Sequence, residues 1–140
     1  MPLPGSAKPD GPAVLLVDDR PENLLALEET LAPLVEETGV RLLRAGTAEE
    51  ALRHLLQEDG SVAVVLLDVM MSGGDGREAY RELRTRADLL DVPVVMMSAA
   101  VQSDGLDPSI AAFLRKPFDL DHLVVLVTNL IGPSHADGRA

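Results

Sequence analysis

The stretch VAVVLLDVMMSGGDG, residues 62 to 76, decides the fold. Six apolar residues lead directly into Asp68, and a glycine-rich turn follows at once. A short run that is β-branched and almost wholly apolar is typical of a strand buried on both faces, as in parallel sheets. Asp68 then lies at the carboxyl edge of the sheet, where open α/β folds bind their ligands. A lone aspartate after a strand often only begins a turn, so its meaning depends on what other strands bring to this edge.

Composition limits the class of protein. The chain has 140 residues, the length of one domain with a substantial core. It contains no cysteine, which fits a reducing compartment, and it shows neither a signal-peptide pattern nor an apolar run of membrane length. We therefore expect a soluble, cytoplasmic protein. A net charge of −11 disfavours direct binding to nucleic acid or to an anionic membrane surface.

Four further segments are predicted to be strands: residues 13–17, 40–45, 92–97 and 111–115. Two arginines interrupt the segment 40–45, which indicates a strand at the edge of the sheet. Helical patterns separate the strands throughout the chain. This alternation predicts an α/β fold with a five-stranded parallel sheet, right-handed crossovers and helices on both faces.

Capping residues and apolar spacing predict the first two helices. Pro21 suits the first turn of one helix, and Pro33 is expected to end or kink it. Thr47 and Glu50 form the pattern of a capping box in front of a second helix. The apolar stripe predicted for the first helix consists of Leu24, Leu27, Leu31 and Leu34.

Two more helices are predicted in the second half of the chain. The first covers residues 76–87, with a thin inner face made of Ala79, Leu83 and Ala87. The other is capped by Asp119, and Gly132–Pro133 is expected to stop it. This last segment is rich in valine, so a strand remains an alternative there.

The two ends of the chain are expected to lie outside the folded unit. Residues 1–12 carry four prolines and two glycines, which predicts a disordered leader. Residues 132–140 are predicted to be a flexible tail. The single domain is therefore expected to cover residues 13–131.

Polar residues follow four of the predicted strands. Asp18 and Asp19 come after residues 13–17, and the strands that follow along the chain end on Asp68, Ser98 and Lys116. Because parallel strands bring their carboxyl ends to the same edge, all of these residues should meet there. Chance supplies one or two polar residues at such places more readily than three carboxylates, a hydroxyl and an ammonium group.

With these residues in order, the chain resembles the receiver domain of two-component response regulators, a flavodoxin-like phosphoacceptor module. The resemblance covers residues 13–131 and rests on four motifs: Asp18–Asp19, DVMMSGGDG at 68–76, MMSAA around Ser98 and FLRKPF at 113–118. It implies the strand order 2-1-3-4-5, with strands counted along the chain. It also implies that Asp68 accepts a phosphoryl group.

The resemblance further implies roles for the other residues at this edge. Asp18 and Asp19 would hold a divalent cation with Asp68, Asp19 directly and Asp18 through water, and the backbone carbonyl of Met70 would complete the protein ligands. The remaining roles are a hydroxyl switch, an aromatic rotamer switch and the invariant lysine, which fall on Ser98, Phe113 and Lys116. The Lys116–Pro117 bond would be cis, as it is in the family.

Electrostatics agrees with a cation at this site. Two carboxylates 4 Å apart repel each other by about 4 kcal/mol at an effective dielectric constant near 20, so three of them remain ionised together only with a cation present. Oxygen ligands with room for water suit Mg²⁺, or Mn²⁺ in its place.

The resemblance also implies the partners. The phosphoryl group would come from a histidine kinase or a histidine phosphotransfer protein, and the chain would catalyse only its own phosphorylation and dephosphorylation. No direct contact with nucleic acid or a membrane is expected. A homodimer would form through the face of the fourth and fifth helices.

Two features depart from the family. Ser72 stands where a proline is usual. The segment Ala99–Ala112 contains Gly105 and Pro108 and is short for a crossover with a full helix, which predicts that the fourth helix is short or missing.

Two other functions remain open. A degenerate receiver would only dock protein partners, although the intact acidic residues and Lys116 disfavour this. An aspartyl-phosphate hydrolase is the second. Enzymes of that kind resembling the haloacid dehalogenase family place an aspartate two residues after the nucleophile, where this chain has Met70.

Overall fold

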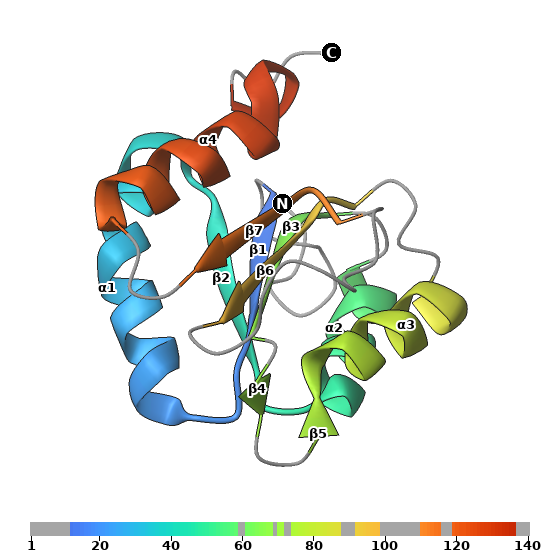
Figure 1. Cartoon of the computed structure of the whole chain (residues 1–140). Helices are drawn as coiled ribbons and strands as arrows, with labels where there is room; N and C mark the ends of the chain where they lie inside the picture. Colours follow the sequence, from blue (N-terminus) through green and yellow to red (C-terminus); the bar gives the residue numbers. More distant parts are fainter. Residues whose placement is uncertain are drawn as a thin grey trace.

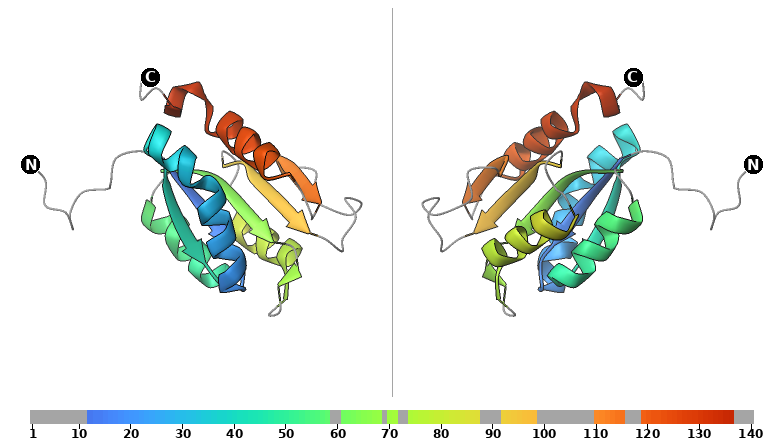
Figure 2. Two further views of the ribbon diagram at one scale, coloured as in Figure 1. Left: turned by 90° about the vertical axis from the view of Figure 1, so that its left-hand side faces the viewer. Right: turned by 90° about the vertical axis from the view of Figure 1, so that its right-hand side faces the viewer.

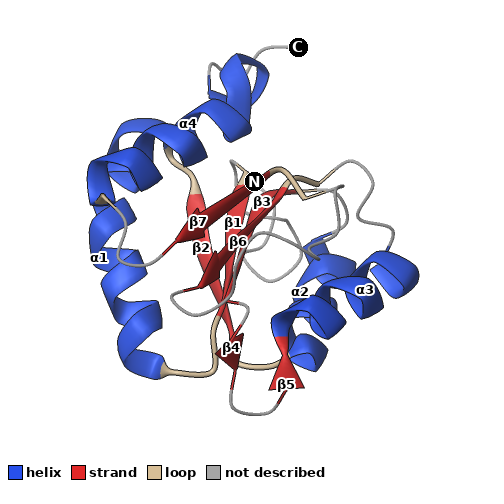
Figure 3. Cartoon of the chain, in the orientation of Figure 1, coloured by secondary structure: helices blue, strands red, loops and turns tan. Residues whose placement is uncertain are grey.

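The computed structural model describes residues 12–58, 61–68, 70–71, 74–87, 92–98, 110–115 and 119–136. Figure 1 and Figure 3 show the helices and strands that these residues form. In chain order they are β1 (Ala13–Val17), α1 (Pro21–Thr38), β2 (Arg41–Ala45), α2 (Ala48–Glu58), β3 (Val62–Asp68), β4 (Met70–Met71), β5 (Gly74–Asp75), α3 (Gly76–Ala87), β6 (Val94–Ser98), β7 (Ala112–Arg115) and α4 (Leu120–Ala136).

Five parallel strands form the central sheet in the order β2-β1-β3-β6-β7. Helices α1 and α4 cover one face of this sheet and helices α2 and α3 cover the other (Figure 1, Figure 2). The predicted α/β fold and the strand order 2-1-3-4-5 are thereby confirmed. The predicted edge position of the strand near residues 40–45 is confirmed as well, because β2 is the first strand of the sheet.

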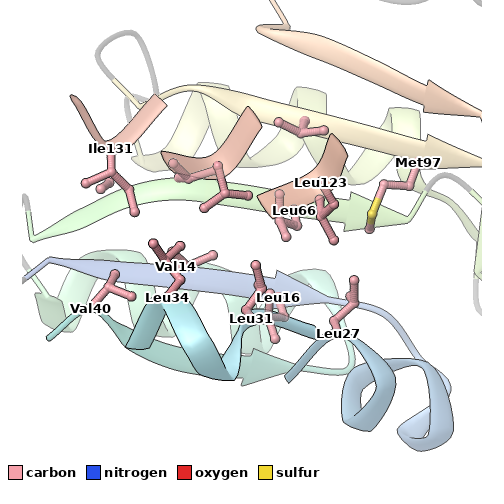
Figure 4. Close-up of a cluster of buried hydrophobic side chains, with 14 of the residues drawn as sticks. Val14, Leu16, Leu27, Leu31, Leu34, Val40, Leu66, Met97, Leu123 and Ile131 are labelled. Atoms are coloured by element: carbon pink, nitrogen blue, oxygen red, sulfur yellow. The ribbon is translucent and has the colours of Figure 1, made fainter. Parts of the chain in front are cut away.

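The hydrophobic core is divided by the sheet into two clusters. Alternate residues of each strand contribute to opposite clusters, as the pleat of a strand requires: Leu15 and Val17 face one cluster, whereas Val14 and Leu16 face the other. The second cluster contains the predicted leucine stripe of α1 and the buried side chains of α4 (Figure 4). All seven residues of β3 are buried, which confirms a central strand covered on both faces.

Helix α1 begins at Pro21, as predicted, but it does not end near Pro33. Leu31 and Leu34 are buried on either side of this proline, so core packing offsets the loss of one backbone hydrogen bond. The helix ends at Gly39, whose φ of 76° lies in the left-handed region. Its N–H donates to the carbonyl of Val35 at 2.9 Å, a bond typical of a helix C-terminus.

The capping box of α2 is present in a modified form. The backbone N–H of Glu50 donates to Oγ1 of Thr47 at 3.1 Å, as expected. The Glu50 carboxylate, however, accepts from the N–H of Gly46 at 2.6 Å, one residue earlier than in the usual reciprocal bond. The first bond satisfies a backbone donor that the first turn of a helix leaves open, and the second ties the residue before the cap to the same turn.

The inner face of α3 includes a residue that the sequence analysis did not select. Tyr80 is 3% exposed. With Leu83 it belongs to the core cluster on the face of the sheet that α2 and α3 cover. The guanidinium carbon of Arg84 lies 5.8 Å from the centre of the Tyr80 ring, within the range of a cation–π contact. The side chains of Ala79 and Ala87 lie outside the described part of the chain.

Helix α4 decides the open question for the last segment, because it is helical rather than extended. Oδ1 of Asp119 accepts from the N–H of Asp121 at 2.9 Å, which confirms the predicted cap. The predicted stop at Gly132–Pro133 is wrong, since the helix continues to Ala136. A proline removes one intrahelical hydrogen bond, yet its φ is close to the helical value, so it does not end a helix by itself.

Two arginines of the edge strand β2 bind the flanking helices. Arg41 forms an ion pair with Glu58 of α2 at 2.8 Å. Arg44 forms a two-pronged pair with Glu28 of α1, with Nε 2.6 Å from Oε2. His54 of α2 lies with Nε2 2.8 Å from the backbone oxygen of Arg44. Charged side chains of this kind protect an edge strand from pairing with another chain.

Three remaining points concern the turn after β3, membrane-spanning helices and the predictions that fall on undescribed residues. Strands β4 and β5 form a small antiparallel pair, with Met70 opposite Asp75, where only a turn was expected. No helix in the described ranges has the length and apolar character needed to cross a bilayer. The predictions for Ser72, for the short crossover helix after residue 98 and for the cis bond at Lys116–Pro117 lie outside the described residues.

Candidate functional site

The register of the sheet brings three polar residues to one edge. Val17 of β1 pairs with Leu67 of β3, so Asp18 and Asp68 occupy equivalent positions at the ends of neighbouring strands. Asp68 pairs with Met97 of β6, and Ser98 is the next residue of that strand. Neighbouring strands are about 5 Å apart. The structure therefore gathers three of the predicted site residues at the carboxyl edge, where α/β folds bind ligands.

Burial distinguishes these three residues from the rest of the described chain. Asp18 and Ser98 are fully buried and Asp68 is 4% exposed, and together they make up the buried polar and charged residues of the described ranges. Burying a carboxylate is costly unless it is paired or bound to a metal. Two buried carboxylates on adjacent strands are thus a feature that core packing alone does not explain.

Asp18 is held by the beginning of α1. Its Oδ1 accepts from the backbone N–H of Arg20 at 2.9 Å, and its Oδ2 accepts from Nδ2 of Asn23 at 3.1 Å. Its own N–H donates to the carbonyl of Ala45 at 3.0 Å, which fixes the backbone against β2. Asn23 was not among the residues predicted from the sequence, although an amide side chain in the first helical turn after two aspartates is a usable signal.

Asp19 is positioned differently from its neighbour. The residue is half-buried and lies beyond the last paired residue of β1. One oxygen of its carboxylate, Oδ1, is buried. Asp19 therefore places a carboxylate oxygen inside the protein surface immediately after the strand, while Asp18 turns both of its oxygens to donors of α1.

The remaining predicted site residues are described to different extents. Phe113 of β7 pairs with Met96 of β6 and is partly buried against the cluster on the α2 and α3 side of the sheet. The backbone of Met70 belongs to β4, directly after the end of β3, but its side chain lies outside the described part. Lys116 is one residue beyond β7 and lies outside the described part of the chain, so its role stays a prediction.

The donor atoms at this edge fit a hard cation with few protein ligands. Among the described residues, no three Asp, Glu, His or Cys side chains form a ready-made metal site. Asp18 accepts from Arg20 and Asn23, and Asp19 and Asp68 bring the other two carboxylates to this edge. Mg²⁺ is commonly bound by one or two carboxylates and keeps several waters, so such a set suits it.

Comparisons with known proteins agree with this geometry. The response regulator receiver domain family matches residues 14–128 of the chain. Response regulator Rre1 of Synechocystis sp. is 32% identical over 133 residues, covering 91% of this chain and 55% of that protein. Sensor histidine kinase GacS of Pseudomonas protegens is 30% identical over 132 residues, covering 86% of this chain and 13% of that protein. The chain thus spans about half of Rre1 and a small part of GacS.

Solved structures show the same architecture. Response regulator protein TrrA from Thermotoga maritima, in complex with Mg(2+)-BeF, superposes with a TM-score of 0.70 at 28% identity. The similarity covers 85% of this chain and 98% of that one. The family match covers most of the chain, and the fold and the buried acidic edge agree with it. The chain therefore belongs to the family of response regulator receiver domains.

Proposed function

We propose that the chain is a phosphoacceptor in two-component or phosphorelay signalling and that Asp68 carries the phosphoryl group. The observation that supports this most directly is the burial of Asp18 and Asp68 at the ends of adjacent strands. Two like charges separated by the spacing of neighbouring strands, about 5 Å, repel each other by about 3 kcal/mol at an effective dielectric constant near 20. A protein retains them for a chemical reason, and cation-assisted phosphoryl transfer is the reaction that the family match favours.

In the proposed reaction, a carboxylate oxygen of Asp68 attacks the phosphorus atom of the donor. A new O–P bond forms as the P–N bond of a phosphohistidine, or the P–O bond of a small acyl phosphate, breaks, and the leaving group takes the electron pair. Phosphoryl transfer depends mainly on positioning and on neutralising the charge of the phosphoryl oxygens. A bound Mg²⁺ would supply much of that neutralisation.

Each of the other residues has a proposed task. Asp19, Asp68 and the backbone carbonyl of Met70 would hold the cation, and Asp18 would act through water bound to it. Lys116 would pair with a phosphoryl oxygen. For Ser98 and Phe113 we propose the switch roles. The Ser98 hydroxyl would move to donate to the phosphoryl group, and the partly buried Phe113 ring would change its rotamer in response. The burial of Ser98 at the end of β6 supports its part.

The proposed donor is a histidine kinase or a histidine phosphotransfer protein. Family membership supports this, and so does the similarity to a segment of a sensor histidine kinase. The chain would promote only its own phosphorylation and dephosphorylation, in the cytoplasm. A homodimer would use the face that includes α4, where Leu120 and Val125 are more than half exposed.

Intact-mass measurement after incubation with a small acyl phosphate tests the proposal. Wild type with Mg²⁺ should gain the mass of one phosphoryl group, and wild type in EDTA or the Asp68→Asn variant with Mg²⁺ should not. Continuous release of phosphate without a stable mass gain would instead indicate a hydrolase. Absence of any gain over a wide range of Mg²⁺ and donor concentrations would contradict the proposal and favour a module that only docks partners.

A further inference from the structure

We infer that Asn23 is a positioning residue that sets the affinity of the acidic edge for Mg²⁺ by fixing the orientation of Asp18. This inference rests on the proposed function, because it assigns a task in the same site. It concerns a residue of α1 that lies outside the strand ends and that none of the motifs contains. The contact that carries it is the bond from Asn23 Nδ2 to Asp18 Oδ2, at 3.1 Å.

The geometry gives Asp18 one defined orientation. Its two carboxylate oxygens accept from different donors, the backbone N–H of Arg20 and the side-chain amide of Asn23. Two bonds on two oxygens fix the plane of the carboxylate, whereas the backbone donor alone would leave rotation about the Cβ–Cγ bond. Asp18 itself is fully buried, so the bond from Asn23 is one of the few donors within its reach.

The remaining acceptor capacity of Asp18 suits a bridge to metal-bound water. An ionised carboxylate offers about four lone-pair sites, and the bonds from Arg20 and Asn23 use one on each oxygen. A water that bridges the cation and Asp18 can hydrogen-bond well only if the remaining lone pair of the carboxylate points in a fixed direction. Groups that orient a carboxylate near a metal in this way influence metal affinity as strongly as some ligands do.

Asn23 is suited to this task by its place in the helix. It lies in the first turn of α1, which begins at Pro21, two residues after Asp19. The neighbouring Leu24 points into the core and is buried. The helix is thus anchored by apolar packing one residue away, so that the amide of Asn23 is delivered to Asp18 by a rigid element.

The test is a titration of MgCl₂ followed by amide NMR, with wild type, Asn23→Leu and Leu24→Ala compared. Asn23→Leu keeps the bulk of the side chain and removes its donor. Leu24→Ala weakens the same helical turn without touching Asp18. We expect the dissociation constant for Mg²⁺ to rise about tenfold in Asn23→Leu, as for other residues that orient metal ligands, and to stay within a factor of two of wild type in Leu24→Ala. The side-chain amide signals of Asn23 should also shift on addition of Mg²⁺.

Other results would overturn the inference. Equal affinity in Asn23→Leu and wild type would show that Asn23 is structural only, and so would an equal loss in Leu24→Ala. Tighter binding in Asn23→Leu would mean that the amide competes with the cation. In each of these cases wild type still binds Mg²⁺ and the proposed function stands. Failure of wild type to bind Mg²⁺ at millimolar concentration would overturn both.

Discussion

Asp18 and Asp68 lie at equivalent positions on adjacent parallel strands, one residue beyond the paired Val17 and Leu67, and both are buried. The two carboxylates differ in their surroundings, because Asp18 accepts from a backbone N–H and from Asn23 at the start of α1. Asp68 follows a strand that is buried along its whole length. Both carboxylates therefore lie at the ends of neighbouring strands, and the donors to Asp18 come from the start of α1.

The crowding of carboxylates predicts a stability effect at Asp68. Asp68→Asn is nearly isosteric and removes one negative charge, so it should stabilise the metal-free protein by about 1 kcal/mol. Chemical denaturation in EDTA measures this, with Glu29→Gln at an exposed position in the middle of α1 as the control. Added Mg²⁺ should stabilise wild type more than the variant. A ligand stabilises the folded state according to its affinity for that state, and the variant lacks the proposed cation ligand Asp68. A variant that is less stable than wild type in EDTA would contradict the electrostatic account.

The pair between Glu28 and Arg44 predicts a pH dependence. The hydrogen bond from Arg44 lowers the pKa of Glu28 below its ordinary value of 4.5. A folded-state pKa below that of the unfolded chain means that the pair stabilises the fold above about pH 4.5. This contribution is lost as the pH falls through the folded-state pKa.

Comparing Glu28→Gln with wild type checks this sign. The variant should be slightly less stable at pH 7. The difference should begin to shrink as the pH falls below about 4.5, disappear below the folded-state pKa of Glu28, and shrink in high salt. Glu36→Gln, at an exposed position of the same helix, serves as the control. A difference that persists in acid would assign the effect to packing of the side chain rather than to its charge.

The burial of Tyr80 predicts a large loss of stability on truncation. Tyr80→Ala should lower the free energy of unfolding by about 3 kcal/mol, because it opens a cavity between α3 and the sheet. Denaturant titration gives the value, and Arg81→Ala, at an exposed position in the middle of the same helix, should change it by less than about 0.5 kcal/mol. A Tyr80→Ala variant as stable as the control would place the ring outside the core.

Gly39 predicts a backbone effect that is separate from packing. A Cβ atom at this position would meet nothing within 4 Å, so only the φ of 76° opposes a side chain. Gly39→Ala should therefore cost about 1 kcal/mol of stability. Gly39→Asn should cost less, since asparagine tolerates the left-handed region better. Equal costs for both substitutions, measured by thermal unfolding, would argue against this cause.

Much of the fold was predictable because the apolar and charged residues of each strand reflect its position in the sheet. The buried strand before Asp68 reads as apolar on both faces, and the edge strand carries arginines, so central and edge positions are visible in the sequence. The predicted site followed from the other strand ends, since polar residues follow four of the five predicted strands. These features depend on local sequence, which is why they could be predicted without the tertiary structure.

What was missed depends on tertiary packing. Pro33 was expected to end or kink a helix that continues because leucines on both sides of it are buried. Tyr80 was passed over because a charged helix gave a narrow apolar face, and its burial depends on the space between α2 and the sheet. The bond between Asn23 and Asp18 joins residues five positions apart, and only the turn from β1 into α1 brings them together.

The central claim is that Asp68 accepts the phosphoryl group, and the most direct test identifies the modified residue itself. Wild type is phosphorylated with a small acyl phosphate and Mg²⁺ and then treated with borohydride, which reduces an aspartyl phosphate to homoserine. Peptide mass spectrometry then locates the reduced residue. The account predicts homoserine at position 68 and its absence from samples prepared in EDTA. Homoserine at position 18 or 19, or phosphate retained on a hydroxyl such as that of Ser98, would contradict it.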